Sequence, residues 1–319
     1  MGNPVGALDG IAVVPLDRGR NGGRYWTGHF FHAFRLPIAM PAGQFHMQRS
    51  AIPGVQAVSA RSRHAFARHT HEQFGIGVMR VGAQVSHSGR GQVQAGPGCV
   101  ITVNPGEVHD GAPIGDGERA WQMLYLDPGV VAACIADIAG DGPPTSGDAG
   151  VLSRTLRYAF EHPARNQPDL ARRVLALYAQ VTAGASTLAC DALLLRVLAQ
   201  AGGAHGLASD REGVPAGLRH AISLIDDDPA AALSLADLAG ASGLSRYQVL
   251  RAFSRATGLT PHAYQLQRRL LLARRLIRQG MALAGAAATA GFADQSHMTR
   301  LFVRAYGVSP RRYALAAGA

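Results

Sequence analysis

Lysine is absent from this chain of 319 residues, so all 31 of its strongly basic side chains are arginines. Cysteine is rare, and Cys99, Cys134 and Cys190 are odd in number and widely spaced. They fit neither a disulfide framework nor a zinc cluster and indicate a reducing compartment, so we expect a cytoplasmic protein. The sequence has no run of 18 apolar residues and no apolar signal core near its start. Neither a transmembrane helix nor a cleaved leader is therefore expected.

The composition that remains is that of globular domains. Apolar residues make up 47% and charged residues 16% of the chain, and the length predicts about two domains. The charge is uneven, because residues 214–319 hold 13 Arg against 5 Asp, a net +8, whereas residues 1–213 have a net +2. Codon bias can explain arginine in place of lysine but not this asymmetry. The excess predicts a phosphate-binding surface in the C-terminal part.

One pattern in this basic region occurs twice. Seven residues return at a constant offset of 49, and only Thr changes to Ser. The first copy is Arg251, Phe253, Arg255, Gly258, Thr260, Pro261 and Tyr264, and the second is Arg300, Phe302, Arg304, Gly307, Ser309, Pro310 and Tyr313. A repeat of this kind predicts one supersecondary unit used twice.

The repeated unit has the layout of a helix-turn-helix. Ala239 is small enough to let two helices approach, and Gly243 suits a turn that needs positive φ. Ser245 can cap a second helix over 246–256, which Gly258 can end. Two such units make a DNA-reading domain the leading hypothesis. The alternative is that these helices present ordinary solvated faces of a helical bundle.

The fold class predicted for the whole chain is α+β multidomain. Residues 1–50 are rich in Gly, Pro and Arg and are expected to be disordered. Residues 51–127 predict a small barrel with strands at 55–60, 73–79, 83–87, 92–95, 99–103 and 120–126. Residues 128–205 predict helices at 128–139, 150–161, 168–184 and 187–201. A linker at 206–214 precedes an all-α domain at 215–319, with helices at 216–227, 234–241, 245–256, 261–279, 282–289, 294–305 and 310–316.

The C-terminal domain resembles the AraC/XylS family of bacterial transcription regulators. The resemblance rests on Leu235-Ala-Asp-Leu-Ala239, Gly243-Leu-Ser245, Gly291-Phe-Ala-Asp-Gln-Ser296, and Gly307-Val-Ser-Pro310 with Tyr313. It implies one DNA-binding domain in which a long helix joins two helix-turn-helix units. It also implies double-stranded DNA as a partner, activation of transcription, and contact with RNA polymerase. Carried over by position, the DNA-binding residues are Arg246, Tyr247, Leu250, Arg251, Gln295, Ser296, His297, Thr299 and Arg300.

Helical periodicity supports this assignment for the first recognition helix. Its apolar residues recur at helical spacing and should face the core, which leaves outside Arg246, Tyr247, Gln248 and Arg251. Arginine can fork onto guanine and glutamine onto adenine, each giving about 1–3 kcal/mol of discrimination. Gln248 therefore joins the candidate DNA-binding residues.

The barrel region resembles a cupin, in the effector-binding version found in AraC-like regulators. The resemblance rests on His69-Thr-His71, Gly82, a turn with Gly98, and Pro105-Gly106 followed by His109. Metal-binding cupins add a Glu where this chain has Gly75 and Ile76, and Glu72 should point to the opposite side of a strand. We favour a metal-free effector pocket with no cofactor. Three imidazoles could instead hold Zn, Cu, Ni or Fe, or be purely structural.

The sequence thus predicts a ligand-responsive, sequence-specific DNA-binding regulator without catalytic residues. The expected effector-binding residues are His69, His71, Gln73 and His109. Together with nearby Arg63 and Arg68, they favour a small polar effector that is anionic or zwitterionic. The segment from Arg61 through His71 and Pro105 to His109 is similar to regulators often coupled to amino-acid exporters, which implies an amino acid or related carboxylate. The helices at 150–201 are expected to form a homodimer. Two other classes stay open: a metal-dependent cupin enzyme fused to a DNA-binding domain, and an architectural DNA binder without effector.

Overall fold

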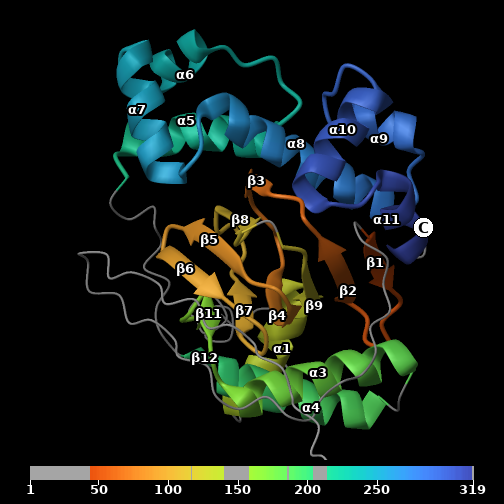
Figure 1. Cartoon of the computed structure of the whole chain (residues 1–319). Coiled ribbons are helices and arrows are strands. Elements are labelled where there is room, and N and C mark those ends of the chain that lie inside the picture. Colours follow the sequence, from red (N-terminus) through yellow and green to blue (C-terminus); the bar gives the residue numbers. More distant parts are fainter. Residues whose placement is uncertain (1–43, 116, 140–157, 185–186, 204–213, 318–319) are drawn as a thin grey trace, which may run out of the picture. The chain divides into compact units, whose positions relative to one another are not determined.

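A computed structural model of the chain describes residues 44–115, 117–139, 158–184, 187–203 and 214–317 (Figure 1). It contains a β-rich N-terminal domain with a helical extension and an all-α C-terminal domain, as the predicted α+β multidomain class requires. Within these ranges, no helix combines the length and the apolar character that crossing a bilayer needs. The N-terminal extension up to residue 43 and the linker residues 206–213 lie outside the described residues.

Two antiparallel sheets form the N-terminal domain. The larger has the strand order β1-β2-β9-β4-β7-β11 and the smaller has the order β3-β8-β5-β6. The strands are β1 (Gln44–Gln48), β2 (Val55–Ser62), β3 (Phe66–His69), β4 (Phe74–Val81), β5 (Gln84–Ser88), β6 (Gly91–Ala95), β7 (Val100–Val103), β8 (His109–Pro113), β9 (Arg119–Leu126) and β11 (Ala164–Arg165). The first six residues of β4 are all buried, because this central strand is covered on both faces.

The six predicted strands are present, and the structure adds others. The prediction of disorder up to residue 50 is wrong for the residues of β1, because this strand pairs with β2 along its whole length. Strands β3 and β8 also escaped prediction. Their sequences, FARH and HDGAP, lack the alternation of apolar and polar residues that marks a half-buried strand.

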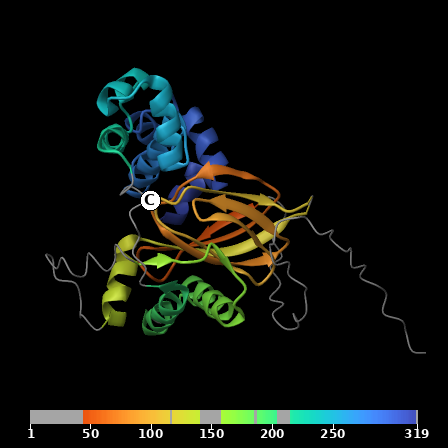
Figure 2. The same cartoon turned by 90° about the vertical axis from the view of Figure 1, so that its left-hand side faces the viewer.

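Three helices of the N-terminal domain agree with prediction: α1 (Pro128–Ala139), α3 (Pro168–Ala183) and α4 (Thr187–Ala201). Helix α3 lies against the larger sheet, and Figure 2 shows α3 and α4 side by side beneath it. The face of α3 that points to the sheet carries Leu170, Val174, Leu177 and Val181, which share one buried cluster with β4 and β9. This spacing of three to four residues is what predicted the helix.

The helix predicted at 150–161 is absent from the last residues of this range, which are the part that the structure describes. Ala159–Phe160 forms a short strand, β10, which pairs with β12 (Gly202–Gly203). Phe160 is 1% exposed and packs edge-on against Phe74, with ring centroids 5.7 Å apart. The segment is therefore extended because its aromatic side chains fill the core between barrel and helices. Residues 150–157 lie outside the described residues.

The helices of the C-terminal domain begin and end within one residue of the prediction. They are α5 (Ala216–Asp227), α6 (Leu235–Ser242), α7 (Arg246–Thr257), α8 (Pro261–Arg278), α9 (Leu283–Thr289), α10 (Gln295–Tyr306) and α11 (Pro310–Ala317). Helices α6 and α7 form the first helix-turn-helix unit, and α9 and α10 form the second. Helix α8 joins the two units (Figure 1).

The sequence repeat is also a structural repeat. Ser245 before α7 and Asp294 before α10 each accept a hydrogen bond from the backbone N–H three residues later, at 3.3 and 2.6 Å. Each helix ends at a glycine in the left-handed conformation, Gly258 with φ 73° and Gly307 with φ 72°. A side-chain cap at the start and a positive-φ glycine at the end fix the length of both helices.

Candidate effector cavity and DNA-reading surface

Three imidazoles meet inside the barrel, those of His69 and His71 buried and that of His109 half-buried. His69 ends β3 and His109 begins β8, and these two residues are direct cross-strand partners. His71 follows β3 by two residues. The ring centroids are 4.4 Å apart for His69 and His109, 4.9 Å for His69 and His71, and 5.2 Å for His71 and His109. The sequence correctly predicted this convergence, although the two strands are neighbours in one sheet and do not face each other across the barrel.

The tautomers of two imidazoles follow from their hydrogen bonds. Nδ1 of His69 lies 2.7 Å from the carbonyl oxygen of Ala67, and Nδ1 of His109 lies 3.0 Å from that of Glu107. A carbonyl oxygen only accepts, so each Nδ1 carries the proton. The Nε2 atoms of both rings are then left as acceptors.

All three imidazoles are neutral at pH 7. Burial, together with the neighbouring His109, lowers the pKa of His69 to about 3. Burial also holds the pKa of His71 well below its usual value, with His69 and His109 as further causes. The pKa of His109 is lowered by burial as well. At the histidine cluster a ligand therefore meets ring-nitrogen acceptors and no imidazolium charge.

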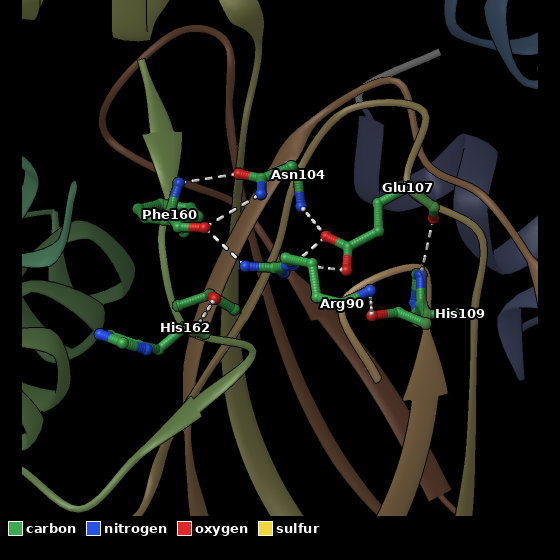
Figure 3. A network of polar contacts seen from close by, with 8 residues as sticks. Arg90, Asn104, Glu107, His109, Phe160 and His162 are labelled. Carbon is green, nitrogen blue, oxygen red and sulfur yellow. Dashed lines mark hydrogen bonds and ion pairs between the residues drawn. The ribbon is translucent and has the colours of Figure 1, made fainter. Parts of the chain in front are cut away.

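The loop that carries His109 is held by a half-buried acid–base pair (Figure 3). Arg90 forks onto Glu107, with Nε–Oε1 at 2.8 Å and Nη2–Oε2 at 2.5 Å. The backbone N–H of Asn104 donates to the same carboxylate at 3.0 Å. The Asn104 amide exchanges two hydrogen bonds with the backbone of Phe160, which ties this loop to β10. The carboxylate of Glu107 is thus fully used for positioning.

The histidine cluster provides up to three nitrogen ligands for a metal. Their donor atoms lie within 4.8 Å of one another. No carboxylate joins them among the described residues, because Glu107 is bound by Arg90 and Glu72 pairs with Arg275 at 3.1 Å. A Cβ at Gly75 would lie 2.8 Å from Cε of Met123, so an acidic side chain there would have to displace the flexible end of that methionine. Within the described residues, the ligand set is three imidazoles without a carboxylate.

A cavity of about 140 Å³ surrounds the cluster. Its barrel wall is aromatic and apolar, with Phe45, Phe66, Trp121, Met123 and Tyr125 beside the three histidines. Arg274 of α8, Tyr306 of α10 and Tyr313 of α11 also line it. A concave, mostly apolar space with a few converging polar groups is the usual form of a small-molecule site.

The structure corrects one predicted effector residue and adds another. Gln73 does not line the cavity; its amide donates to Asp127 at 2.8 Å and accepts from Arg274 at 3.1 Å. Arg119, which sequence reasoning missed, does line it. The available signal was the alternation along β9, because Arg119, Trp121, Met123 and Tyr125 share one face at a period of two.

The first recognition helix presents most of its predicted residues to solvent. Arg246, Tyr247, Leu250 and Arg251 are exposed, and the guanidinium of Arg251 lies 5.7 Å from the centre of the Tyr247 ring. Gln248 is exposed too, but its Oε1 accepts from the backbone N–H of Ser245 at 2.9 Å. Forking onto adenine needs both the oxygen and the NH₂ group, so Gln248 must give up this capping bond to read a base.

The second recognition helix is less uniformly exposed. Gln295, Ser296 and Arg300 face solvent, whereas His297 and Thr299 are half-buried. The His297 ring packs edge-on against Phe292, with centroids 5.7 Å apart. Gln295, Ser296 and Arg300 are therefore the more accessible of the five residues assigned to this helix.

Comparisons with known proteins agree with this architecture. The family described as an AraC-like ligand binding domain matches residues 52–198, and a helix-turn-helix domain family matches residues 238–316. The transcriptional regulator YbfI of Bacillus subtilis is 25% identical over 236 residues, which cover 73% of this chain and 81% of YbfI. The transcriptional activator RhaS of Escherichia fergusonii is 35% identical over 143 residues, covering 44% of this chain and 51% of RhaS.

A solved structure shares the overall fold. A variant of ToxT from Vibrio cholerae superimposes with a TM-score of 0.50 at 11% identity, covering 84% of this chain and 100% of ToxT. This likeness concerns the fold alone. The two family matches occur in the order that the sequence predicts, and the curated relatives are transcription regulators. The chain belongs to the AraC family and is a transcriptional regulator with a ligand-binding domain followed by a helix-turn-helix DNA-binding domain.

Proposed function

We propose that this regulator senses a small polar effector in the barrel cavity and in response changes how it acts at a promoter. One observation carries the proposal. The protein combines a partly open cavity, lined by three neutral imidazoles, with two capped helices whose first turns are exposed. His69, His71 and His109 are the effector contacts, and their acceptor nitrogens suit a ligand with hydroxyl or amino groups.

Helix α8 is the element that couples the two sites. Arg274 of α8 lines the effector cavity, and the same helix joins the two helix-turn-helix units. A ligand in the cavity would contact α8 directly and favour one of its positions. Regulation needs such an element, because an effector shifts an equilibrium only through unequal affinity for its two states.

DNA reading is assigned to the exposed residues of α7 and α10. Arg246, Tyr247, Leu250 and Arg251 form one reading face, and Gln295, Ser296 and Arg300 form the other. His297, Thr299 and Gln248 support these faces. Activation is the expected outcome at the promoter, because RhaS and the Rhodococcus protein NphR are named transcriptional activators. RNA polymerase is then the further partner, and the cytoplasm is the expected place of action.

A metal-dependent enzyme is the less favoured alternative. Within the described part of the chain, no hydroxyl, thiol or carboxylate side chain is hydrogen-bonded to any of the three imidazoles. A nucleophile paired with a base, which is the common arrangement in hydrolytic and transfer enzymes, is therefore missing from these residues. A binding role, with no catalytic residue and no cofactor, is the simpler interpretation.

The test uses the full-length protein. DNA selected from a random pool defines the preferred site, and a metabolite screen by thermal shift finds ligands that stabilise the fold. A true effector at 100 times its Kd adds about 2.7 kcal/mol of stability. It should also alter promoter affinity or transcription in vitro. Sequence-independent DNA binding, together with no response to any metabolite, would favour an architectural DNA binder.

A further inference from the structure

We propose that Arg119 is the anchor for a carboxylate of the effector, so that the barrel selects small acids with an apolar body. This inference rests on the proposed effector site and names the chemical class that the site takes. Arg119 is the first residue of β9 and lies at the opposite end of the cavity wall from Tyr125 on the same strand.

Arg119 is buried without an acidic partner. The residue is 1% exposed, and its side chain forms no ion pair among the described residues. Nη2 donates to the carbonyl oxygens of His64 at 2.9 Å and Gly111 at 3.0 Å. Nε and Nη1 have no acceptor at all. An arginine in a protein interior is normally paired, so a partner is missing from this site.

The acids nearest to Arg119 are committed elsewhere. The adjacent Glu118 binds Nε of Arg61 at 2.6 Å. Asp110, which lines the same cavity, accepts from the backbone N–H of His87 at 2.7 Å. Glu107 is forked by Arg90. Although one oxygen of Glu118 has no partner, none of these carboxylates forms an ion pair with Arg119 among the described residues, so its guanidinium is available to an incoming anion.

Two aromatic rings position the guanidinium. Its central carbon lies 5.5 Å from the centre of the Phe66 ring and 5.1 Å from that of Trp121. Stacking and the two carbonyl contacts fix the plane of the group, while Nε and Nη1 stay unpaired. Nη2, which would complete a fork with either Nε or Nη1, is already bound to two carbonyl oxygens, so a carboxylate would accept a single charge-assisted hydrogen bond from Nε or from Nη1. The geometry is therefore prepared for an acid before the ligand arrives.

The size of the cavity limits the rest of the ligand. It encloses about 140 Å³, and an apolar cavity of about 150 Å³ accepts a molecule the size of benzene. Phe45, Met123 and Val103 provide apolar contacts for such a body. A carboxylic acid with one ring or a short branched chain fits this description.

Matched pairs of acid and amide test the proposal on the wild-type, full-length protein. Benzoate and 3-methylbutanoate are compared with benzamide and 3-methylbutanamide by thermal shift and by calorimetry. We expect both acids, or the one with the better shape, to raise Tm, and the amides to have no effect. In a spectrum of arginine side chains, the Nε–H signal of Arg119 should move on titration with the acid.

Variants then locate the contact. Arg119→Met should weaken acid binding about 10- to 100-fold, with circular dichroism confirming that the variant folds. Arg173→Met, which removes an exposed arginine of α3, should bind as the wild type does. Equal stabilisation by acid and amide, or undiminished binding by Arg119→Met, would overturn the proposal, and so would the absence of any shift with both acids. A neutral metabolite that shifts Tm and changes DNA binding would overturn only the inference that the effector carries a carboxylate. The proposed function as a ligand-responsive regulator would stand.

Discussion

His69 and His109 are bound in the same way on two paired strands. Each Nδ1 donates to the carbonyl oxygen two residues before it in the chain, and the ring centroids lie 4.4 Å apart. Both Nε2 atoms are thereby presented as acceptors to the same cavity. Backbone hydrogen bonds of this kind set the tautomer and ring orientation, so the site is organised without a ligand.

Removal of a cavity imidazole should abolish the effector response while DNA binding is retained. His71→Ala and His109→Ala each delete a ring that lines the cavity and leave the exposed residues of α7 and α10 unchanged. The measurement is effector-dependent transcription in vitro beside effector-free DNA affinity. His220→Ala, on an exposed position of α5, is the matched control. Loss of folding in both cavity variants would show that the imidazoles are structural.

Stability should fall as the pH is lowered below 6.5. The folded-state pKa of His69 is lowered by burial to about 3, so the unfolded chain binds more protons between pH 6.5 and 3. Each such histidine changes the free energy of unfolding by about 1.4 kcal/mol per pH unit in that window. Tm measured from pH 7 to 4.5 should drop less steeply for His69→Gln than for the wild type. An unchanged slope would contradict the neutral, buried state of His69.

The Arg90–Glu107 pair should stabilise the fold more than a surface ion pair does. Its side chains are 25% and 11% exposed, and Glu107 also accepts from the backbone of Asn104. Arg90→Met leaves that carboxylate without its charged partner and should cost about 2 kcal/mol in urea unfolding. Arg172→Met removes one side of the exposed Arg172–Asp169 pair and should cost less than about 0.5 kcal/mol. Equal losses would show that the Arg90 contact does not hold the loop.

Base reading should depend on the position of an arginine in its recognition helix. Arg251→Ala or Arg300→Ala should cost about 1–3 kcal/mol on the preferred site and relax base preference locally. Arg255→Ala removes the same charge from the last turn of α7, which bases do not reach in the usual docking geometry. It should weaken all sequences alike and lower the salt slope by about one unit. Unchanged preference in Arg251→Ala would show that Arg251 contacts only phosphate.

The DNA-binding domain was predictable because its signals are local. Ser245 and Asp294 cap their helices through the N–H three residues later, and Gly258 and Gly307 end them at positive φ. Each of these contacts lies within one turn of chain, so the sequence alone specifies the boundaries. The histidines that converge in the barrel were found through the resemblance to cupins.

The remainder of the cavity depends on contacts that are distant in sequence. The Gln73 side chain lies outside the predicted site because Asp127 and Arg274 bind its amide. Arg119 is drawn in because Phe66, on another sheet, stacks on its guanidinium. A charged residue at a strand end is usually solvated, and only strand pairing shows which face it shares. These two corrections determine the expected ligand. Residue type gives neither of them, and the alternation along β9 places Arg119 on one face of the strand without showing that this face lines a cavity.

The homodimer expected from residues 150–201 can be tested at one leucine. Leu188, near the start of α4, is 81% exposed although its helix otherwise packs on α1 and α3. Burial of Leu188 in an interface stabilises the dimer by about 1.5–3 kcal/mol for each copy of the residue. A twofold axis places one Leu188 from each subunit in the interface, so two copies contribute. Dimerisation would also raise the effective concentration of the second DNA-binding domain and give about 10²- to 10⁴-fold higher avidity.

Sedimentation of the full-length protein should show a dimer that Leu188→Glu converts to a monomer. Leu315→Glu, at a leucine of α11 that is 65% exposed, should remain dimeric. A wild-type protein that is monomeric at micromolar concentration, with and without DNA, would contradict this model of assembly.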